Sequence, residues 1–314
     1  MKFSFGWKPT ARTMFVCLVF IVVNQVAAEE WYPSRYGADD EIGAANNLGE
    51  GKVRSAATLV EKGKVYSLAV DLNAQWPAIR GREFHLDVRM SMIRPLGPNQ
   101  LTGHDDLLIS HLALGTSVDG LGHVGINYRY YNGLTEEDVF SRTGLKKLGL
   151  HAVPPIVTRG VLLDMARHAG VDYLEAGVQF NTEEIQAVAD RQGVKIGSGD
   201  VVLFHTGWMV MLESDPKRYM AEEPGLGKAG AQYLADLGVV LVGADSRAVE
   251  VQPYADGEVA PVHQILLAKN GVYILEHVRT AELAADQTYE FLFVMAVPKI
   301  EGAVQGIVHP VAIR

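Results

Sequence analysis

The sequence predicts an α/β fold, with a mixed β-sheet core flanked by helices in a single domain. Strand-like apolar runs alternate with helix-like segments along most of the 314 residues, which is typical of the α/β class. Residues 239–243 are apolar without interruption, as in a strand that is buried on both faces. The chain contains no internal repeat and no low-complexity linker, so nothing indicates a second domain.

The individual elements follow from local patterns. Residues 29–60 are polar and rich in Gly, Ala and Asn, which predicts an irregular arm with one short helix. Strands are expected where apolar and β-branched residues run together or alternate, at residues 65–72, 84–93, 107–119, 158–164, 201–206, 239–243, 272–275 and 289–297. Helices are expected at residues 182–192, 228–237 and 262–268. Thr182 is the expected N-cap of the first helix, because two glutamates follow it, and Gly238 ends the second.

Residues 1–28 have the order of a cleaved secretory signal peptide. Three basic residues precede an apolar run at 14–23, and small residues occupy 26–28. The run is shorter than the roughly 20 apolar residues that span a bilayer. We therefore expect a periplasmic or secreted domain at residues 29–314. An uncleaved N-terminal anchor is the alternative.

Charge and cysteine content exclude several functions. The net charge of −9 falls to −12 without the three basic residues of 1–28. So acidic a chain is a poor partner for nucleic acid or an anionic membrane. The one cysteine, Cys17, lies in the expected signal peptide, so the mature chain has no disulfide, thiolate metal site or cysteine nucleophile. The remaining functions use histidine, carboxylate, hydroxyl or metal chemistry on a small-molecule substrate.

The segment SHLALGTSVDGLGH at residues 110–123 carries the first candidate site. Alternate residues of an extended segment share a face, so Ser117 and Asp119 point the same way. Two glycines after Asp119 allow a turn that returns His123 beside it. A carboxylate next to an imidazole suits metal binding or general acid–base catalysis. The pattern also fits an aspartate that only caps a turn.

A second candidate segment is PVHQILLAKNGVYILE at residues 261–276. His263 begins an apolar helical turn, and Glu276 ends an apolar strand. A charged residue at the end of a buried strand is costly unless it is paired or binds an ion. A glutamate that emerges at the surface is the alternative.

These segments, together with TRGVLLD, GDVVLFHTGW and VGADSRAVEV, resemble the cyclase and kynurenine formamidase family of metal-dependent hydrolases. The resemblance runs from about Trp31 to the C-terminus. The family hallmark His-x-Gly-Thr-His-x-Asp-x-Pro-x-His falls on residues 113–123. This chain keeps the Gly, the Thr, the Asp and the last His, but has Ala113, Ser117 and Leu121 where the family has His, His and Pro.

The resemblance implies which residues hold metal in the family and which of them this chain retains. In the family, the first two histidines and the aspartate hold one metal, and the aspartate, a later histidine and a later glutamate hold a second. The second set is retained here as Asp119, His263 and Glu276, so we expect one divalent transition metal, zinc or manganese, per chain. Ser117 is a candidate for an added hydroxyl ligand. His123 falls on the proton-transfer residue of the family.

Weaker signals concern the substrate pocket. Trp76 lies where the family places an aromatic residue against its substrate, although a core tryptophan fits equally. His205 follows a buried strand and is a candidate for the pocket wall or for a local hydrogen bond. Asp245 ends another buried strand, where it orients a pocket group or caps a turn. Glu250 is expected to be a solvated or paired structural carboxylate.

The leading functional hypothesis is hydrolysis of an amide or lactone. By resemblance, the first substrate class is an aromatic formamide such as N-formylkynurenine, followed by cyclic amides and lactones of the isatin type. The missing imidazoles favour one alternative, a non-catalytic periplasmic protein that binds a small molecule on a hydrolase fold. A metal-free hydrolase with His123 as base is another. The resemblance also implies a homo-oligomer, a dimer or a tetramer.

Overall fold

Most of the chain is organised around one large β-sheet. The computed structural model describes residues 1–4, 6, 31–79, 81–255 and 257–314, and Trp31–Arg314 forms one compact unit. Within the described residues, nine strands pair in the order β1-β13-β11-β5-β7-β9-β10-β4-β12. Their bounds are β1 Val65–Ser67, β4 Ser117–Asp119, β5 Ile156–Asp164, β7 Val201–His205, β9 Leu241–Ala244, β10 Tyr273–Glu276, β11 Glu290–Met295, β12 Gln305–Ile307 and β13 Val311–Ile313.

The sheet is parallel at its centre and antiparallel at both sides. β5, β7, β9 and β10 run parallel to one another. β11 pairs antiparallel with β5 at one side, and β4 pairs antiparallel with β10 at the other. Every residue of β9 and β10 is buried, as is typical of strands that are covered on both faces. The predicted α/β class with a mixed sheet is confirmed.

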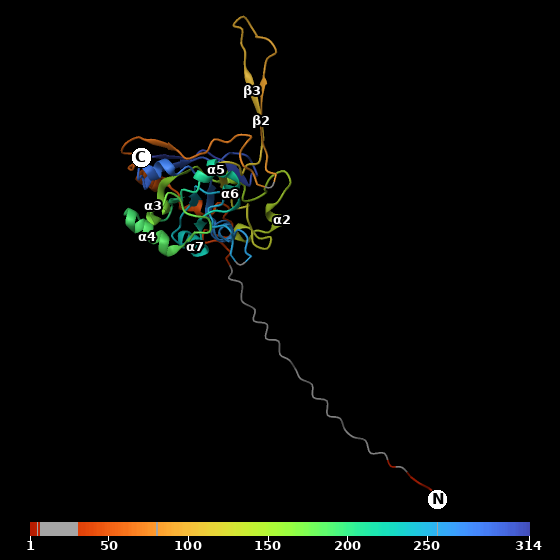
Figure 1. The fold of residues 1–314 in the computed structure, drawn as a ribbon. Coiled ribbons are helices and arrows are strands. Elements are labelled where there is room, and N and C mark those ends of the chain that lie inside the picture. Colours follow the sequence, from red (N-terminus) through yellow and green to blue (C-terminus); the bar gives the residue numbers. More distant parts are fainter. Residues whose placement is uncertain (5, 7–30, 80, 256) are drawn as a thin grey trace. The chain divides into compact units, whose positions relative to one another are not determined.

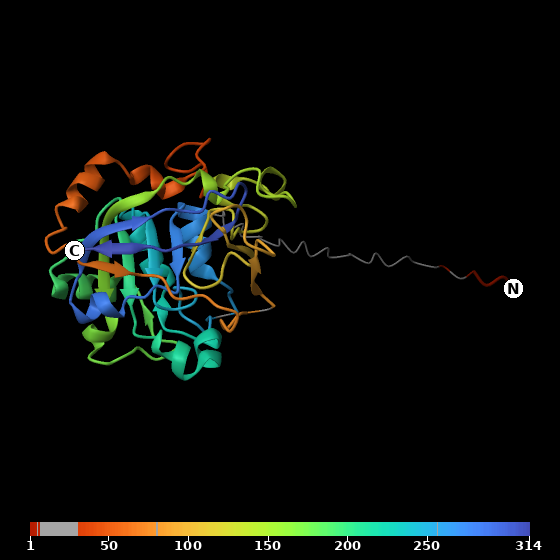
Figure 2. The same ribbon diagram turned by 90° about the horizontal axis from the view of Figure 1, so that it is seen from above.

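Helices and short strands surround this sheet (Figures 1 and 2). α1 packs against β5 and β11, and α4 packs against β5. The helical elements are η1 Gly43–Asn47, α1 Glu50–Ala57, η2 Tyr131–Gly133, α2 Glu136–Val139, η3 Leu150–Ala152, α3 Met165–Ala169, α4 Thr182–Gln192, α5 Val210–Ser214, α6 Pro216–Ala221, α7 Lys228–Asp236, α8 Pro261–His263, η4 Gln264–Lys269 and α9 Ala281–Ala285. β6 Gln179–Phe180 pairs with β8 Gly225–Leu226.

The elements differ from the sequence prediction in three instructive places. The extended segment expected at residues 107–119 is two strands, because Gly115 has a φ of +61° between them. The helix expected at residues 262–268 begins at Pro261 and widens into the π-helix η4. α4 is capped by Asn181 rather than Thr182. Asn181 has extended backbone angles, and its N–H donates to Glu184 at 2.8 Å.

The predicted signal peptide, residues 1–28, lies outside the described residues apart from residues 1–4 and 6. Cleavage and export therefore stay predictions. In the part of the chain that the structure describes, the helices are too short or too polar to cross a membrane.

A two-stranded hairpin stands away from the body of the fold (Figure 1). It consists of β2 Phe84–Met90 and β3 His104–Ser110, with Leu86 paired to Leu108. Because side chains alternate along a strand, Leu86, Val88, Met90 and Leu108 share one face. These side chains are 52%, 59%, 71% and 51% exposed. An apolar face of this kind is typical of an interaction surface.

We expect this hairpin face to mediate the predicted homo-oligomer, because apolar faces of two copies can bury each other in a symmetric contact. The variant Leu86→Glu/Leu108→Glu should shift the protein to a monomer, since it places charges in that contact. Light scattering after size-exclusion chromatography measures the change. Leu107→Glu, on the opposite face of the hairpin, is the control and should leave the assembly intact. A wild-type monomer at micromolar concentration would refute the expectation.

Candidate metal centre and active site

Two buried carboxylates are placed by the pairing of β4 with β10. Ile274 lies opposite Asp119, and Glu276 lies opposite Ser117. Residues two apart on a strand share a face, so Asp119 and Glu276 are diagonal neighbours on the same face of the sheet. Asp119 is fully buried and Glu276 is 8% exposed. The register of two short strands therefore brings together residues that are far apart in the sequence.

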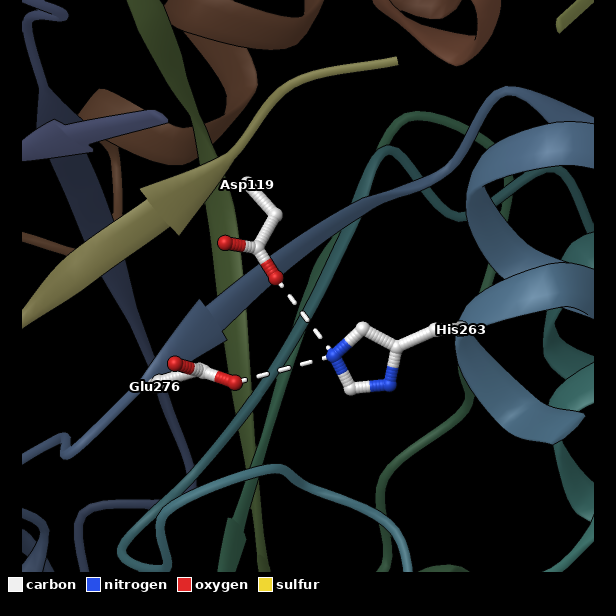
Figure 3. Close-up of side chains that lie close together, drawn as sticks. All are labelled: Asp119, His263 and Glu276. Carbon is white, nitrogen blue, oxygen red and sulfur yellow. Dashed lines mark ion pairs between the residues drawn. The ribbon is translucent and has the colours of Figure 1, made fainter. Parts of the chain in front are cut away.

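His263 reaches these carboxylates from the end of α8 (Figure 3). Its Nε2 atom lies 3.5 Å from Asp119 Oδ2 and 3.6 Å from Glu276 Oε1. Ligand atoms of the three residues all lie within 4.8 Å of one another. Three side chains that converge on one point from a strand, a second strand and a helix form the geometry of an open metal site.

Glu250 fixes the orientation of His263. Its Oε1 is hydrogen-bonded to His263 Nδ1, and its Oε2 accepts a hydrogen bond from Val262 N at 2.9 Å. With Nδ1–H directed at Glu250, Nε2 faces Asp119 and Glu276, where it would offer its lone pair to a bound cation. A carboxylate behind a metal-binding imidazole is a recurrent arrangement that sets the tautomer. Glu250 is thus a paired structural carboxylate, one of the two outcomes expected from the sequence.

The residues fit a divalent cation. Asp119 Oδ2 is buried and has no hydrogen-bond partner among the described residues. Burial and the neighbouring Asp119 charge raise the pKa of Glu276. Burial lowers the pKa of His263, but hydrogen bonds to Asp119, Glu250 and Glu276 outweigh it and raise the pKa well above its usual value. The two carboxylates therefore favour a positive charge at His263 Nε2. A cation bound between the three groups would supply this charge.

His123 lies beside this cluster, with Gln305 between it and Asp119. Gln305 Nε2 donates to Asp119 Oδ1 at 2.6 Å and lies 3.4 Å from His123 Nε2. Since the amide nitrogen only donates, His123 Nε2 carries the lone pair. Burial lowers the pKa of His123, although Asp119 acts in the opposite direction. His123 is therefore a neutral imidazole, which is the form that a general base requires.

Gly120 and Gly122, which precede His123, are needed because neighbouring atoms leave no space for a side chain at either position. A Cβ on Gly120 would meet Val304 O at 2.7 Å, and a Cβ on Gly122 would meet Leu145 Cδ1 at 2.5 Å. The turn they permit is closed by a hydrogen bond of 3.0 Å from His123 N to Gly120 O. The expected return of His123 toward Asp119 is thus present.

A cavity of about 410 Å³ opens over the cluster. Its polar lining residues are Arg82, His123, Arg247, Gln252, Tyr254, His263, Glu276, His277 and Gln305. Trp76 also lines it, and its ring meets that of His277 edge to face at 5.3 Å. Burial and the charges of Arg247 and Arg82 lower the pKa of His277 to about 3. Trp76 thus lines the cavity of the candidate metal centre, and its contact with a substrate stays a prediction.

The comparisons with known proteins agree with this architecture. Residues 66–251, more than half of the chain, match the model of the Cyclase family. The chain belongs to this family. No curated protein matches the sequence at the threshold applied.

Several solved structures of the cyclase family share the fold. One described as a novel cyclase is 28% identical, with a TM-score of 0.81, and the alignment covers 89% of this chain and 96% of that one. Isatin hydrolase A from Ralstonia solanacearum is 17% identical, with a TM-score of 0.62, and the alignment covers 83% of this chain and 97% of that one. A potential metal-dependent hydrolase with cyclase activity is 18% identical, with a TM-score of 0.51 and coverage of 79% and 98%.

Two positions of this cyclase-family chain lack the imidazoles of the hallmark. Ala113 lines the cavity with its methyl group, and its carbonyl accepts a hydrogen bond from Arg82 Nη1 at 2.7 Å. Ser117 shares the face of Asp119, and its buried Oγ has no hydrogen-bond partner among the described residues. A hydroxyl in this position is available to an ion or a water, so the role of Ser117 as a ligand stays a prediction.

The interpretation of His205 as a pocket residue needs correction, because its side chain does not line this cavity. Its Nδ1 lies 2.8 Å from Thr280 Oγ1 and 3.2 Å from Asp245 Oδ2, and its ring borders a separate depression beside Arg167. Asp245 accepts hydrogen bonds from Thr206 N and Gly207 N at 2.9 and 2.8 Å. It thus caps the turn after β7 and draws His205 to itself, away from the cavity.

Six polar residues of the cavity were missed by sequence reasoning: Arg82, Arg247, Gln252, Tyr254, His277 and Gln305. Arg247 lies inside the segment VGADSRAVEV that carries the family resemblance, but sequence reasoning did not single it out. Gln305 reaches Asp119 only because β12 pairs with β4. His277 directly follows a candidate ligand. Its φ of +54° is unusual for a residue other than glycine and cannot be read from the sequence.

Metal binding offers the first test of this site. We expect about one divalent transition metal per chain by elemental analysis. Glu250→Gln should weaken metal affinity by roughly 10- to 100-fold, because it removes the carboxylate that orients His263. Competition with a chromogenic chelator measures the change. Glu282→Gln, on the surface beside Lys64, is the control. Wild-type affinity in the Glu250 variant would contradict the assignment.

Proposed function

We propose that this protein is a metal-dependent hydrolase of an amide or lactone. The observation that carries the proposal is the convergence of Asp119, His263 and Glu276 at a cavity that also exposes a neutral His123. An aromatic formamide such as N-formylkynurenine is the first substrate class, and isatin-type cyclic amides and lactones are the second. Structures described as an isatin hydrolase and a potential metal-dependent hydrolase support a hydrolase, and the first of them favours the second substrate class; the formamide rests on the family resemblance alone.

Asp119, His263 and Glu276 would hold the ion. When bound, such an ion acts as a Lewis acid that polarises a carbonyl and makes a water more acidic. Two carboxylates with one imidazole leave coordination positions open for substrate and water. Zinc and manganese both accept this set of ligands.

His123 would move the proton. The water would replace the weak 3.4 Å contact of Gln305 Nε2 at His123 Nε2, and this nitrogen of His123 would then take the proton of the attacking water and return it to the leaving nitrogen or oxygen. Gln305 supports this role, since its amide group bridges His123 Nε2 and Asp119 Oδ1 and fixes the direction of the imidazole. The base is therefore oriented by a neutral group rather than by a second carboxylate.

Trp76 would hold the aromatic part of the substrate. Its indole lies against His277 at one wall of the cavity, and Ile79, Leu114 and Val124 add apolar surface. A planar ring can stack or make edge contacts with the indole. The carbonyl to be attacked would then face the three candidate ligands.

Ala113 and Ser117 favour one rival, a protein that binds a small molecule without converting it. The two substitutions remove the imidazoles of one family metal site. The rival predicts ligand binding without turnover on any formamide or lactone, whether or not metal is supplied.

His123→Ala separates these readings. If His123 is the general base, kcat for the best formamide or lactone should fall by roughly 10²- to 10⁴-fold, while metal content and thermal stability stay near wild type. Steady-state kinetics on the metal-loaded protein measures this. His85→Ala, in the exposed hairpin, is the matched control. An undiminished kcat in His123→Ala would overturn the mechanism, and no turnover by the metal-loaded wild type would favour the binding protein.

A further inference from the structure

Two arginines line the cavity of the candidate metal centre without a carboxylate partner. Arg82 and Arg247 both border it. Neither forms an ion pair with any carboxylate of the described residues, whereas Arg159, Arg167 and Arg218 all do. Among the described residues, Glu276 is the only carboxylate that lines the cavity, and it faces His263. The two guanidinium charges are therefore available to a ligand.

The guanidinium of Arg247 is held in place by neutral and backbone contacts. Its Nη2 donates to Gln252 Oε1, and Gln252 Nε2 donates to Glu223 Oε1 at 3.2 Å. Glu223 Oε2 in turn accepts from Arg247 N at 2.6 Å. The Nε atom of Arg247 is buried and has no hydrogen-bond acceptor among the described residues. A buried N–H without an acceptor is costly, so a ligand that supplies one is favoured.

Arg82 is fixed on another part of the cavity wall. It lies just before the hairpin, and its Nη1 donates to Ala113 O just after the hairpin at 2.7 Å. This contact holds the guanidinium close to a position where the family has a metal-binding imidazole. A permanent positive charge therefore lies beside the backbone of Ala113.

With a divalent cation bound, the charges of the metal centre would not compensate these arginines. Asp119 and Glu276 together carry two negative charges, which a divalent cation would cancel. The chain as a whole has a net charge of −9, so a positive cavity is not the consequence of a basic protein. It is a local feature that concentrates anions at one place.

We propose that the cavity recognises a carboxylate on its ligand through Arg247 and Arg82, so that the substrate is an anionic amide or lactone. The planar guanidinium matches a carboxylate with two parallel hydrogen bonds. The reaction part of this inference rests on the proposed function. The binding part does not, and the two are tested separately.

Binding is tested with benzoate and benzamide, which have nearly the same shape but differ in charge. Isothermal titration of the purified, metal-containing protein should show at least a tenfold preference for benzoate. Arg247→Gln should remove most of this preference, and Arg82→Lys should reduce it while keeping a donor for Ala113 O. Arg54→Gln, an exposed arginine on α1, is the control and should leave the preference unchanged. Circular dichroism confirms that each variant is folded.

Chelation identifies what benzoate binds. A preference that survives removal of the metal but is lost in Arg247→Gln supports the arginine site. A preference that disappears with the metal and survives in Arg247→Gln means that benzoate is a metal ligand only, and overturns the inference. Equal affinity for benzoate and benzamide overturns it as well.

Turnover gives the second readout. Formanilide is compared with its 2-, 3- and 4-carboxylate derivatives, which carry the same formamide bond. At least one carboxylate isomer should have a kcat/KM roughly 10- to 100-fold above that of formanilide, and Arg247→Gln should collapse this ratio. Hydrolysis without any carboxylate preference would refute the anion site alone. A benzoate preference without hydrolysis of any compound would refute the proposed reaction and leave the anion site standing.

Discussion

The buried pair of carboxylates on β4 and β10 is the constraint on which the site depends. Asp119 and Glu276 lie next to each other in the interior, where two like charges strongly disfavour one another. His263 relieves this only by bringing a positive charge, carried by a proton or by an ion that its Nε2 helps to hold. Glu250 takes the other nitrogen, so the imidazole cannot turn away. Burial of these like charges therefore lowers the free energy of unfolding, but it keeps the three groups in a geometry that can bind a cation.

Strand register maintains this geometry. A slip of one residue in β4 would turn Asp119 to the opposite face of the sheet. The register is fixed where β4 begins, because Thr116 Oγ1 donates to His277 O at 2.7 Å and accepts from Val70 N at 3.0 Å. It is fixed again at the other end, where β12 places Gln305 opposite Asp119. A three-residue strand can thus carry a site because both of its neighbours determine its position.

What the sequence could predict follows from the range of the interactions. The long buried strands and the helices α4 and α7 depend on local apolar patterns, and these were predicted close to their observed positions. Asp119, His263 and Glu276 came from family motifs whose spacing survives in this chain. Gln305 could not be found this way, since only the strand order of the sheet brings it to the cavity. Arg247 lies in the family segment VGADSRAVEV, but the segment does not show that a loop carries it to the cavity. His205 shows the converse error: a polar residue at a strand end marks the correct edge of the sheet, but Asp245 decides which way its side chain turns.

The departures from the family hallmark are best understood together with their surroundings. An alanine at position 113 removes a neutral ligand, and in isolation this would only weaken a metal site. In this structure the backbone of Ala113 binds the guanidinium of Arg82, which cannot lose its charge at any physiological pH. A second divalent ion close to that guanidinium would meet electrostatic repulsion as well as a shortage of ligands. The missing imidazole at position 113 and the neighbouring guanidinium of Arg82 therefore both disfavour a second cation, and the guanidinium lies at the cavity wall, where it can act on a substrate.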